Sequence, residues 1–364
     1  MVFHLGKLLW SVSQSAYKNI SVARKMSTAK LLIYDKHGEP ASVLQIKQSE
    51  LKEPEKDEVT VKWLLSPVNP ADINTIQGRY PIKPTFPSIP GNEGVGEIIA
   101  VGSQVKGFSV GDKIVPGTIK LGTWRTCANY KPDEIIKIPK EFGTVEASMF
   151  IVNPCTAYRM LKDFVKLNPG DTVIQNGANS AVGQLVIQLC KVYNFHSVNV
   201  VRDRPNIQEL KNQLKTLGAD EVLTEAEVRT TQIFKNKQLP LPKLACNCVC
   251  GQNALDVLRH LAHGGIMVTY GGMSREPLTI PASALIFKDL TFKGFWMTAW
   301  SETHKNTQEK EDMYKDLAAL FIEKKLQCPP YKIIPFSQYQ EAMVNTLKTE
   351  GKQGVKYILD LTKS

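Results

Sequence analysis

The chain has 364 residues, of which 43% are hydrophobic and 22% are charged, and its formal net charge at pH 7 is +10. This length is enough for a large buried core and favours two domains over one. The hydrophobic and charged fractions are those of a globular protein rather than a disordered one. No segment approaches the roughly 20 apolar residues of a membrane-spanning helix, so we expect a soluble mature protein.

The first 34 residues are basic and rich in serine, and no acidic residue precedes Asp35. The basic residues of this stretch are Lys7, Lys18, Arg24, Lys25 and Lys30. Such a composition predicts a mitochondrial presequence, assigned to residues 1–25, and hence a location in the mitochondrial matrix. A solvated, disordered N-terminus is the alternative. Removal of residues 1–25 lowers the net charge from +10 to +6, and the remaining excess of bases favours acidic partners.

Seven cysteines are present, an odd number that argues against a disulfide framework in a reducing compartment. Cys246, Cys248 and Cys250 alternate within one segment, so on a strand they would share one face as small buried residues. No C-x2-C pair with further ligands occurs. The sequence therefore predicts no structural zinc site.

The part of the chain after the presequence consists of short β-type runs separated by Pro, Gly and charged turns. These runs cover residues 29–34, 42–46, 58–65, 94–101 and 113–115. They predict a compact, mostly β first domain.

From Thr156 onward, helical and strand patterns alternate. The expected helices cover residues 156–164, 181–193 and 206–216, and the expected strands cover residues 172–176, 197–201, 221–223, 244–250 and 265–270. Alternation of this kind predicts a doubly wound parallel sheet.

Residues 171–204 form the most informative unit, with a strand, a glycine turn, a helix and a second strand. Gly177 and Gly183 bracket the turn, where backbone N–H groups and the helix dipole favour a pyrophosphate. Ser180 stands where the middle small residue is usually glycine, so a plain turn without a nucleotide is the alternative.

The second strand of this unit ends with Arg202-Asp203-Arg204 instead of the single acidic residue that usually binds the ribose of NAD. Two guanidinium groups suit an adenosine 2′-phosphate. The sequence therefore predicts NADPH as the cofactor.

Beyond residue 300 we expect a polar link, a helix at 310–324, a β run at 331–335, another helix and a closing strand at 354–361. These elements have no obvious place in the nucleotide sheet and are expected to return to the first domain, with the ligand cleft between the two domains. The expected divisions are residues 1–25, 26–152, 153–299 and 300–364, namely the presequence, the first part of the catalytic domain, the nucleotide domain and the return.

Several segments resemble the medium-chain dehydrogenase/reductase superfamily, namely VNPADIN (68–74), PGNEGVGEI (90–98), VGDKIV (110–115), NPCTAY (153–158) and the nucleotide unit. Others are similar to one branch of it, the mitochondrial trans-2-enoyl-acyl-carrier-protein/CoA reductases. These are IQGRYPIKP (76–84), GANSAVGQ (177–184), VVRDR (200–204), TYGGM (269–273) and KGFWMTAW (293–300). The resemblance implies a GroES-like, β-rich catalytic domain, a Rossmann domain and a homodimer.

The resemblance also implies a zinc-free member of the superfamily. Zinc alcohol dehydrogenases carry a His before the Glu of the second motif, whereas this chain has Asn92 before Glu93. An amide is a poor replacement for imidazole as a zinc ligand. Without a metal, hydrogen-bond donors must polarise the carbonyl, which suits hydride transfer to a conjugated thioester.

The reaction that the resemblance implies is the reduction of a trans-2-enoyl thioester in mitochondrial fatty acid synthesis, with hydride to C3 and a proton to C2. Tyr80 is the implied general acid, because a phenol with a reference pKa of about 10 holds its proton at matrix pH. Arg79 and Lys83 could stabilise the phenolate. Without the resemblance, Tyr80 would be interpreted as a packed aromatic residue of a surface loop.

The cofactor contacts are implied by the same motif matches. Asn153 would lie against the nicotinamide, or serve as the N-cap of the following helix, or both. The other implied positions are Asn179, Ser180, Ala181 and Val182 at the pyrophosphate, Arg202, Asp203 and Arg204 at the 2′-phosphate, Tyr270, Gly271, Gly272 and Met273 at a strand end, Phe295, Trp296 and Met297 at the nicotinamide and acyl pocket, and Lys356. The structural alternatives are a plain turn at Gly271-Gly272, core strand residues at 295–297, and a surface-strand lysine at Lys356.

Two rival functions stay open at this point. One is a zinc-free NADPH:quinone reductase of the same superfamily, against which the Tyr80 loop and the 295–297 segment argue. The other is a nucleic-acid-binding protein that has kept the fold and uses its basic surface. Binding of an acidic acyl carrier protein is a simpler explanation of the positive charge than binding of nucleic acid.

Overall fold

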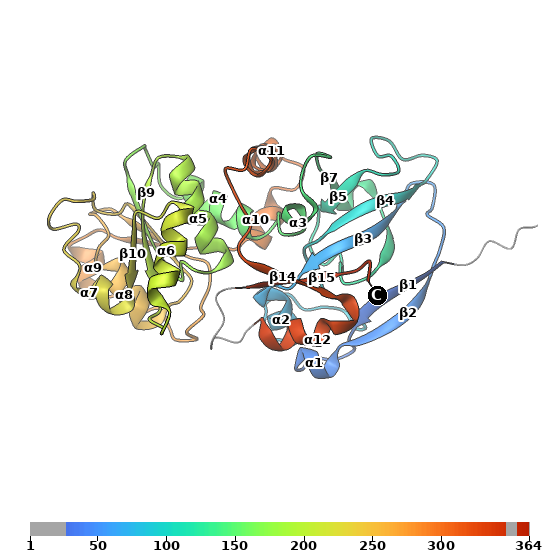
Figure 1. Cartoon of the computed structure of the whole chain (residues 1–364), viewed down its shortest axis with the longest axis horizontal. Helices are drawn as coiled ribbons and strands as arrows, with labels where there is room; N and C mark the ends of the chain where they lie inside the picture. Colours follow the sequence, from blue (N-terminus) through green and yellow to red (C-terminus); the bar gives the residue numbers. More distant parts are fainter. Residues whose placement is uncertain (1–26, 347–354, 364) are drawn as a thin grey trace, which may run out of the picture.

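The computed structural model describes residues 27–346 and 355–363, which form two bodies that lie side by side (Figure 1). The expected presequence, residues 1–25, lies outside the described residues. Among the described residues, no helix combines the length and the apolarity needed to cross a bilayer.

The first body is built around a seven-stranded sheet with the order β14-β15-β3-β4-β5-β7, in which β6 also pairs with β3. Its strands are β3 (Val59–Pro67), β4 (Val95–Val101), β5 (Lys113–Pro116), β6 (Cys127–Tyr130), β7 (Ile135–Lys137), β14 (Tyr331–Pro335) and β15 (Lys356–Asp360). A separate antiparallel hairpin joins β1 (Ser27–Ile33) and β2 (Gln45–Leu51). Trp63 and Trp124 are fully buried in the core of this body.

The last elements of the chain belong to this first sheet. β15 pairs antiparallel with β3, so that Ile358 lies opposite Pro67, and β14 pairs parallel with β15. Before them come α10 (Met297–Thr303) and α11 (Gln308–Ile322), and η2 (Phe336–Gln338) and α12 (Tyr339–Asn345) follow β14. The C-terminal strand therefore lies beside a strand from the first fifth of the chain.

The second body is a six-stranded parallel sheet with the order β10-β9-β8-β11-β12-β13. Its strands are β8 (Thr172–Asn176), β9 (His196–Val201), β10 (Glu221–Thr224), β11 (Leu244–Asn247), β12 (Ile266–Thr269) and β13 (Thr291–Gly294). Its helices are α4 (Asn153–Asp163), α5 (Ala181–Val192), α6 (Ile207–Leu217), α7 (Glu225–Thr230), α8 (Gly251–Leu258) and α9 (Ala282–Ile286). The predicted doubly wound parallel sheet is confirmed, and the order reverses between β8 and β11, where such sheets bind nucleotides.

Residues 42–46 do not form the strand that the sequence analysis predicts. Pro40 opens a short helix, α1 (Pro40–Val43), and β2 begins only at Gln45. Proline has a fixed φ and suits the first turn of a helix, and this local effect outweighs the β-branched character of the segment.

Other boundaries also differ from the prediction. β11 ends at Asn247, so Cys248 and Cys250 are not on a strand, although both are buried. Cys250 has a φ of 68° and immediately precedes α8, which explains why the alternating pattern misleads. The expected polar link beyond residue 300 begins within a helix, α10, and α4 begins three residues before the predicted start.

Other elements of the structure were not predicted. They are α2 (Pro70–Ile76), α3 (Thr144–Ser148), η1 (Pro132–Glu134), β6, β7, β13 and α7 to α9. Most are too short for a hydrophobic period to be visible in the sequence.

Candidate active site

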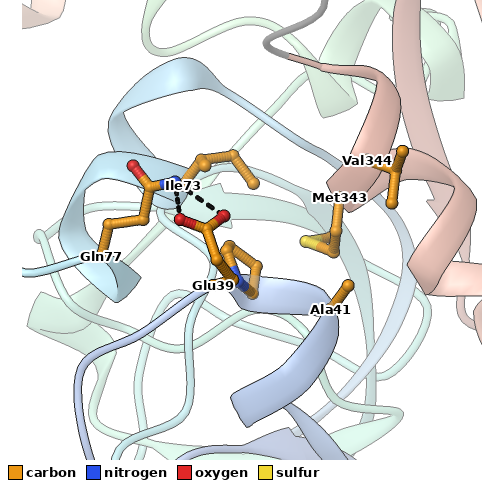
Figure 2. A pocket seen from close by; sticks show the side chains of 7 residues that line it. Glu39, Ala41, Ile73, Gln77, Met343 and Val344 are labelled. Atoms are coloured by element: carbon orange, nitrogen blue, oxygen red, sulfur yellow. Dashed lines mark hydrogen bonds between the residues drawn. The ribbon is translucent and has the colours of Figure 1, made fainter.

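The loop that carries Tyr80 follows α2, and both ends of this helix are held. Pro70 opens it, and the Asn69 amide N donates to Asp72 Oδ2 at 2.8 Å. At the other end Gln77 Nε2 donates to both carboxylate oxygens of Glu39, at 3.2 and 3.1 Å, beside a cavity of about 280 Å³ between α1, α2 and α12 (Figure 2). Tyr80 follows three residues later and is therefore attached to a fixed helix.

Tyr80 meets a residue of the C-terminal half. The indole Nε1 of Trp296 donates a hydrogen bond to the Tyr80 hydroxyl at 2.7 Å, and the two rings lie edge to face with centroids 5.7 Å apart. Trp296 is the N-cap residue of α10 and follows β13 of the second body. This contact joins the two bodies. It brings the residue expected to be the general acid, Tyr80, against a residue expected to line the nicotinamide and acyl pocket, Trp296.

The environment of Tyr80 keeps its phenol protonated. Burial raises the pKa of Tyr80 above its ordinary value, and the nearby Asp72 carboxylate raises it further. Hydrogen bonds from the Trp296 and Thr298 side chains to the phenol oxygen act in the opposite direction and lower the pKa. Lys83, which the sequence analysis considers as a phenolate partner, donates instead to the carbonyl oxygen of Gly78 at 3.0 Å.

A buried polar network lies in the same body. Glu93 is fully buried and accepts hydrogen bonds from Asn69 Nδ2 and from the Val152 amide, both at 2.8 Å. Lys356 Nζ donates to Asn69 Oδ1. Burial raises the pKa of Glu93 and lowers the pKa of Lys356, while their mutual attraction opposes both shifts. Lys356 is 7% exposed, so the interpretation as a surface-strand lysine is wrong.

This network matters for the site because it touches the start of α4. The Val152 amide that binds Glu93 immediately precedes Asn153, the first residue of the helix. The roles of Asn69, Asp72 and Glu93 in this network were not predicted from the sequence. The N-x-x-D spacing around Pro70 was a visible capping signal that could have revealed the first two.

The residues at the zinc position of the superfamily do not fit a zinc ion. Asn92 Nδ2 donates to Asp72 Oδ1 at 2.7 Å, and Asn92 Oδ1 accepts from the Lys120 amide at 3.3 Å. Both ends of this amide are therefore engaged by the protein. Among the described residues, no group of three or more His, Cys, Asp or Glu side chains could hold a metal.

Asn153 is 8% exposed, and its Nδ2 atom is buried without a hydrogen-bond partner among the described residues. Val152 holds the N-cap position of α4, so the expected capping role of Asn153 is wrong. A buried amide donor without an acceptor costs free energy unless a ligand supplies one. The carboxamide oxygen of a nicotinamide is an acceptor of the required kind.

The glycine turn after β8 has the geometry expected of a pyrophosphate site. Gly177 has a φ of 59°, and a Cβ atom there would lie 2.5 Å from Cys248 Sγ. A Cβ atom on Gly183 would lie 2.6 Å from the carbonyl oxygen of Ala178, so only glycine lets α5 approach the turn this closely. Ser180 caps α5, since its Oγ accepts from the Gly183 amide at 3.1 Å.

The early residues of α5 complete this turn. Ala181 and Val182 open the helix directly after Asn179 and Ser180. The first amide N–H groups of a helix lack intrahelical acceptors, and an anion suits them. Ser180, which stands where glycine is usual, thus caps α5 and leaves the other N-terminal amide groups of this helix without intrahelical acceptors.

The other predicted cofactor residues follow the carboxyl ends of parallel strands. Arg202, Asp203 and Arg204 follow β9, and Tyr270 to Met273 follow β12. Neither arginine makes an ion pair with a carboxylate among the described residues, and Arg202 is exposed. Carboxyl ends of parallel strands share one edge of the sheet, so these segments lie at the same edge as the glycine turn.

Residues 295–297 follow β13 and are not core strand residues. Phe295 packs edge to face on Phe164 with ring centroids 5.8 Å apart, Trp296 is 38% exposed, and Met297 is buried. The chain turns from the sheet into α10 at this point. The structure therefore brings Trp296 to Tyr80 and leaves part of its indole surface accessible.

Family models match most of the chain. Residues 55–151 match the alcohol dehydrogenase GroES-like domain, and residues 181–312 match the model described as zinc-binding dehydrogenase. Together with the parallel sheet and its glycine turn, these matches define a medium-chain dehydrogenase/reductase with a GroES-like domain and a Rossmann domain. Asn92, whose amide donates to Asp72, stands where the zinc-binding members carry a histidine.

Curated relatives give the narrower assignment. The chain is 47% identical over 342 residues to the mitochondrial enoyl-acyl-carrier-protein reductase of Rattus norvegicus, covering 93% of this chain and 91% of the relative. It is 44% identical over 335 residues to the corresponding protein of Homo sapiens, covering 92% and 89%. The chain belongs to the family of mitochondrial enoyl-acyl-carrier-protein reductases.

Solved structures agree with this assignment. The complex of Etr1p with NADP and crotonyl-CoA has a TM-score of 0.85 at 38% identity, with 92% of this chain and 100% of that chain covered. The Etr1p/Etr2p heterodimer from Candida tropicalis, a mitochondrial 2-enoyl thioester reductase, has a TM-score of 0.86 at 37% identity and the same coverage. An NADPH:quinone reductase from Bacillus thuringiensis has a TM-score of 0.80 at 24% identity, which shows a shared fold only.

Proposed function

We propose that this chain reduces trans-2-enoyl thioesters to saturated acyl thioesters in mitochondrial fatty acid synthesis, with hydride added to C3 and a proton to C2. NADPH supplies the hydride when it is bound. The observation that carries the proposal is the hydrogen bond between Tyr80 and Trp296, because it places a protonated phenol at the junction of the two bodies. The relatives named above support the substrate class.

Tyr80 is the proton donor of the proposed reaction. Its phenol is held protonated by burial and by Asp72, and the partly exposed Trp296 keeps it oriented. Negative charge develops on the thioester oxygen as C3 is reduced, and the resulting enolate takes the phenol proton at C2. The hydrogen bond from Trp296 then stabilises the phenolate until solvent returns a proton.

The cofactor would be held by an orphaned amide, a glycine turn and two arginines that make no ion pair with a carboxylate among the described residues. The Asn153 amide would donate to the nicotinamide carboxamide, and backbone N–H groups of the turn at 179–182 would donate to the pyrophosphate. Arg202 and Arg204 would bind the 2′-phosphate, with Asp203 between them. Residues 270–273 and 295–297 border the nucleotide and acyl sites, and Lys356 acts through Asn69 at the base of the site.

The remaining assignments concern organisation and partners. Residues 1–25 form the presequence, residues 26–152 and 300–364 the catalytic domain, and residues 153–299 the NADPH-binding domain of a mitochondrial matrix enzyme. An acyl carrier protein presents the substrate, since the mature chain remains basic and carrier proteins are acidic. Nucleic acid is not a partner in this account.

A homodimer forms through the edge of the six-stranded sheet. β13 is an edge strand, and the neighbouring Leu285, Ile286 and Phe287 are 50%, 69% and 75% exposed. An apolar group of this size beside an open strand edge is typical of a protein interface.

The test is NADPH oxidation by the mature chain with a medium-length trans-2-enoyl thioester, beside a panel of quinones and with NADH as the alternative cofactor. Thioester turnover with NADPH is the expected result. Turnover of quinones alone would assign the chain to the rival reductase, and oligonucleotide binding by an inactive protein would support the remaining rival.

A further inference from the structure

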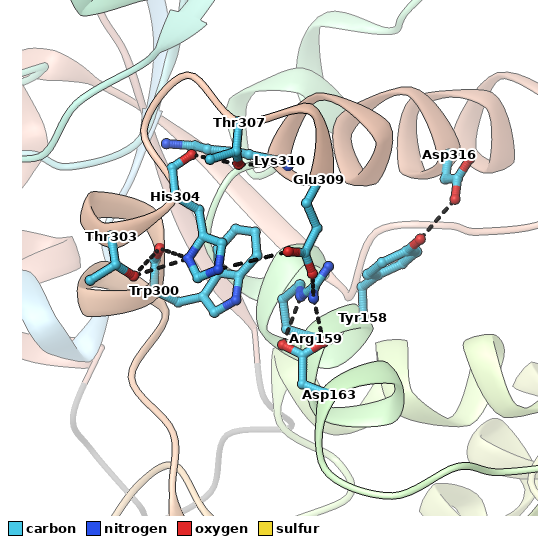
Figure 3. Close-up of polar contacts among 10 residues, drawn as sticks. All are labelled: Tyr158, Arg159, Asp163, Trp300, Thr303, His304, Thr307, Glu309, Lys310 and Asp316. Atoms are coloured by element: carbon cyan, nitrogen blue, oxygen red, sulfur yellow. Dashed lines mark hydrogen bonds and ion pairs between the residues drawn. The ribbon is translucent and has the colours of Figure 1, made fainter.

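Arg159 is a buried arginine of α4 that lies outside every segment assigned to the substrate or the cofactor. Its side chain is 8% exposed, and its guanidinium binds two carboxylates. Nε donates to Asp163 Oδ2 at 2.8 Å, one turn along the same helix, and Nη2 donates to Asp163 Oδ1 and to Glu309 Oε1 on α11 (Figure 3). Paired in this way, the cation is fixed in position.

The fixed guanidinium supports an aromatic residue of α10. The Arg159 Cζ atom lies 4.4 Å from the centroid of the Trp300 ring, within the range of a cation–π contact. His304 stacks on Trp300 with ring centroids 4.1 Å apart and an interplanar angle of 7°. His304 Nε2 also lies 3.7 Å from Glu309 Oε2, and Glu309 is one of the two carboxylates that pair with Arg159.

A single turn of helix joins Trp300 to the residue that holds the acid. The Trp300 amide donates to the Trp296 carbonyl oxygen at 3.0 Å, and Trp296 Nε1 donates to the Tyr80 hydroxyl at 2.7 Å. Arg159 therefore connects to Tyr80 through three consecutive contacts, namely a cation–π contact, a backbone hydrogen bond and an indole hydrogen bond.

α10 needs external support to remain in place. It has seven residues, of which only Met297 is buried, and helices this short are not stable alone. Lys310 adds support at this end, because its Nζ donates to the Ser301 carbonyl oxygen at 3.2 Å. The position of Trp296, at the start of α10, thus depends on contacts that Trp300 and Ser301 make one turn later.

We infer that Arg159 is a positioning residue for the proposed reduction, which fixes Trp296 against Tyr80 by holding Trp300 with a guanidinium that is itself paired to Asp163 and Glu309. The inference rests on the proposed function, since it assumes that Tyr80 is the proton donor. α4 begins with Asn153, so one helix orients both the expected nicotinamide contact and, through α10, the acid.

A double-mutant cycle between Arg159→Met and Trp296→Phe tests the inference. Arg159→Met is expected to lower kcat about tenfold and to leave the KM for NADPH within about twofold of the wild type, because the acid is misplaced while the cofactor groups remain. In the Trp296→Phe background, Arg159→Met is expected to have little further effect on kcat. Arg229→Met, which removes another ion-paired arginine of the same domain, is the control and should leave kcat unchanged.

Several results would overturn the inference. An active Arg159→Met enzyme with wild-type kcat would do so, and so would losses of kcat that are fully additive in the double variant. If Arg159→Met does not fold, Glu309→Gln replaces it, since Glu309 is half exposed and its loss frees one side of the guanidinium. A wild-type chain that is inactive on enoyl thioesters would instead contradict the proposed function, and so the two failures are distinguishable.

Discussion

The Trp296 indole and the Tyr80 phenol share a hydrogen bond of 2.7 Å although 216 positions separate them in the sequence. Tyr80 follows a helix of the first body, and Trp296 follows the edge strand of the second. Tyr80, the proposed proton donor, therefore lies on a loop of the first body but is oriented by a residue that follows a strand of the second body. Any relative movement of the two bodies would therefore change the position of the acid.

Replacement of Trp296 by Phe is predicted to lower kcat about tenfold, since a hydrogen bond worth about 1.4 kcal/mol that orients the acid is lost. The pKa of Tyr80 is already raised by burial and by Asp72, and loss of the indole donor raises it further. The acid works only when protonated, so kcat falls as pH rises through this pKa. The alkaline fall of kcat is therefore expected to move to higher pH in the variant.

A matched control exists in the first body. Trp63 Nε1 donates to the Tyr130 hydroxyl at 3.0 Å, with the rings edge to face and 5.9 Å apart. Trp63→Phe removes the same kind of hydrogen bond in the core. It is expected to lower the free energy of unfolding and to leave the pH profile of kcat unchanged. Identical pH profiles for wild type and Trp296→Phe would refute the role given to Trp296.

The double change Arg202→Ala and Arg204→Ala is predicted to raise the KM for NADPH about 10- to 100-fold, because charge-assisted hydrogen bonds of about 1.5–3 kcal/mol are lost. The KM for NADH is expected to stay nearly constant, since NADH carries no 2′-phosphate. Steady-state kinetics with both cofactors measures the ratio of the KM for NADPH to the KM for NADH. An equal rise of the KM for NADPH and for NADH would show that these arginines do not bind the 2′-phosphate.

Lys356→Met is predicted to lower the free energy of unfolding by about 3–5 kcal/mol at neutral pH, because it leaves buried carboxylates without their cation. Burial already raises the pKa values of Glu93 and Asp72. Without Lys356 these pKa values rise further, and the folded variant binds protons at higher pH than the wild type. The stability deficit is therefore largest at neutral pH and shrinks as pH falls.

Urea unfolding at about pH 5 and pH 7.5 measures this deficit. Lys356→Met combined with Glu93→Gln is the control, since it removes one carboxylate together with the lysine and should recover part of the stability. A deficit that is independent of pH, or absent, would show that Lys356 does not neutralise the network.

The sequence predicted the second body more closely than the first. Strand 172–176 has the predicted bounds, and the helix predicted at 181–193 ends one residue earlier. Buried parallel strands and amphipathic helices leave strong periodic patterns. The short strands β6 and β7 and the helix after Pro40 leave none, and the segment at 244–250 kept an alternating pattern beyond the end of its strand.

The candidate site was predictable where a local motif carries it and not where distant residues meet. The glycine turn, Arg202 and Arg204 depend on spacing within one unit, and the position of Tyr80 came from a family motif. The contact between Tyr80 and Trp296, the orphaned amide of Asn153 and the burial of Lys356 depend on tertiary packing. A lysine at the start of a strand has no sequence signal that it lies beside two buried carboxyl groups.

The central claim is that Tyr80 donates the proton that completes the reduction, and the most direct measurement is the kcat of Tyr80→Phe with NADPH and a medium-length trans-2-enoyl thioester. The variant loses only the hydroxyl oxygen that accepts from Trp296. We predict a fall in kcat of about 100-fold or more, with the KM for NADPH nearly unchanged. A Tyr80→Phe enzyme that turns over as fast as the wild type would contradict the account.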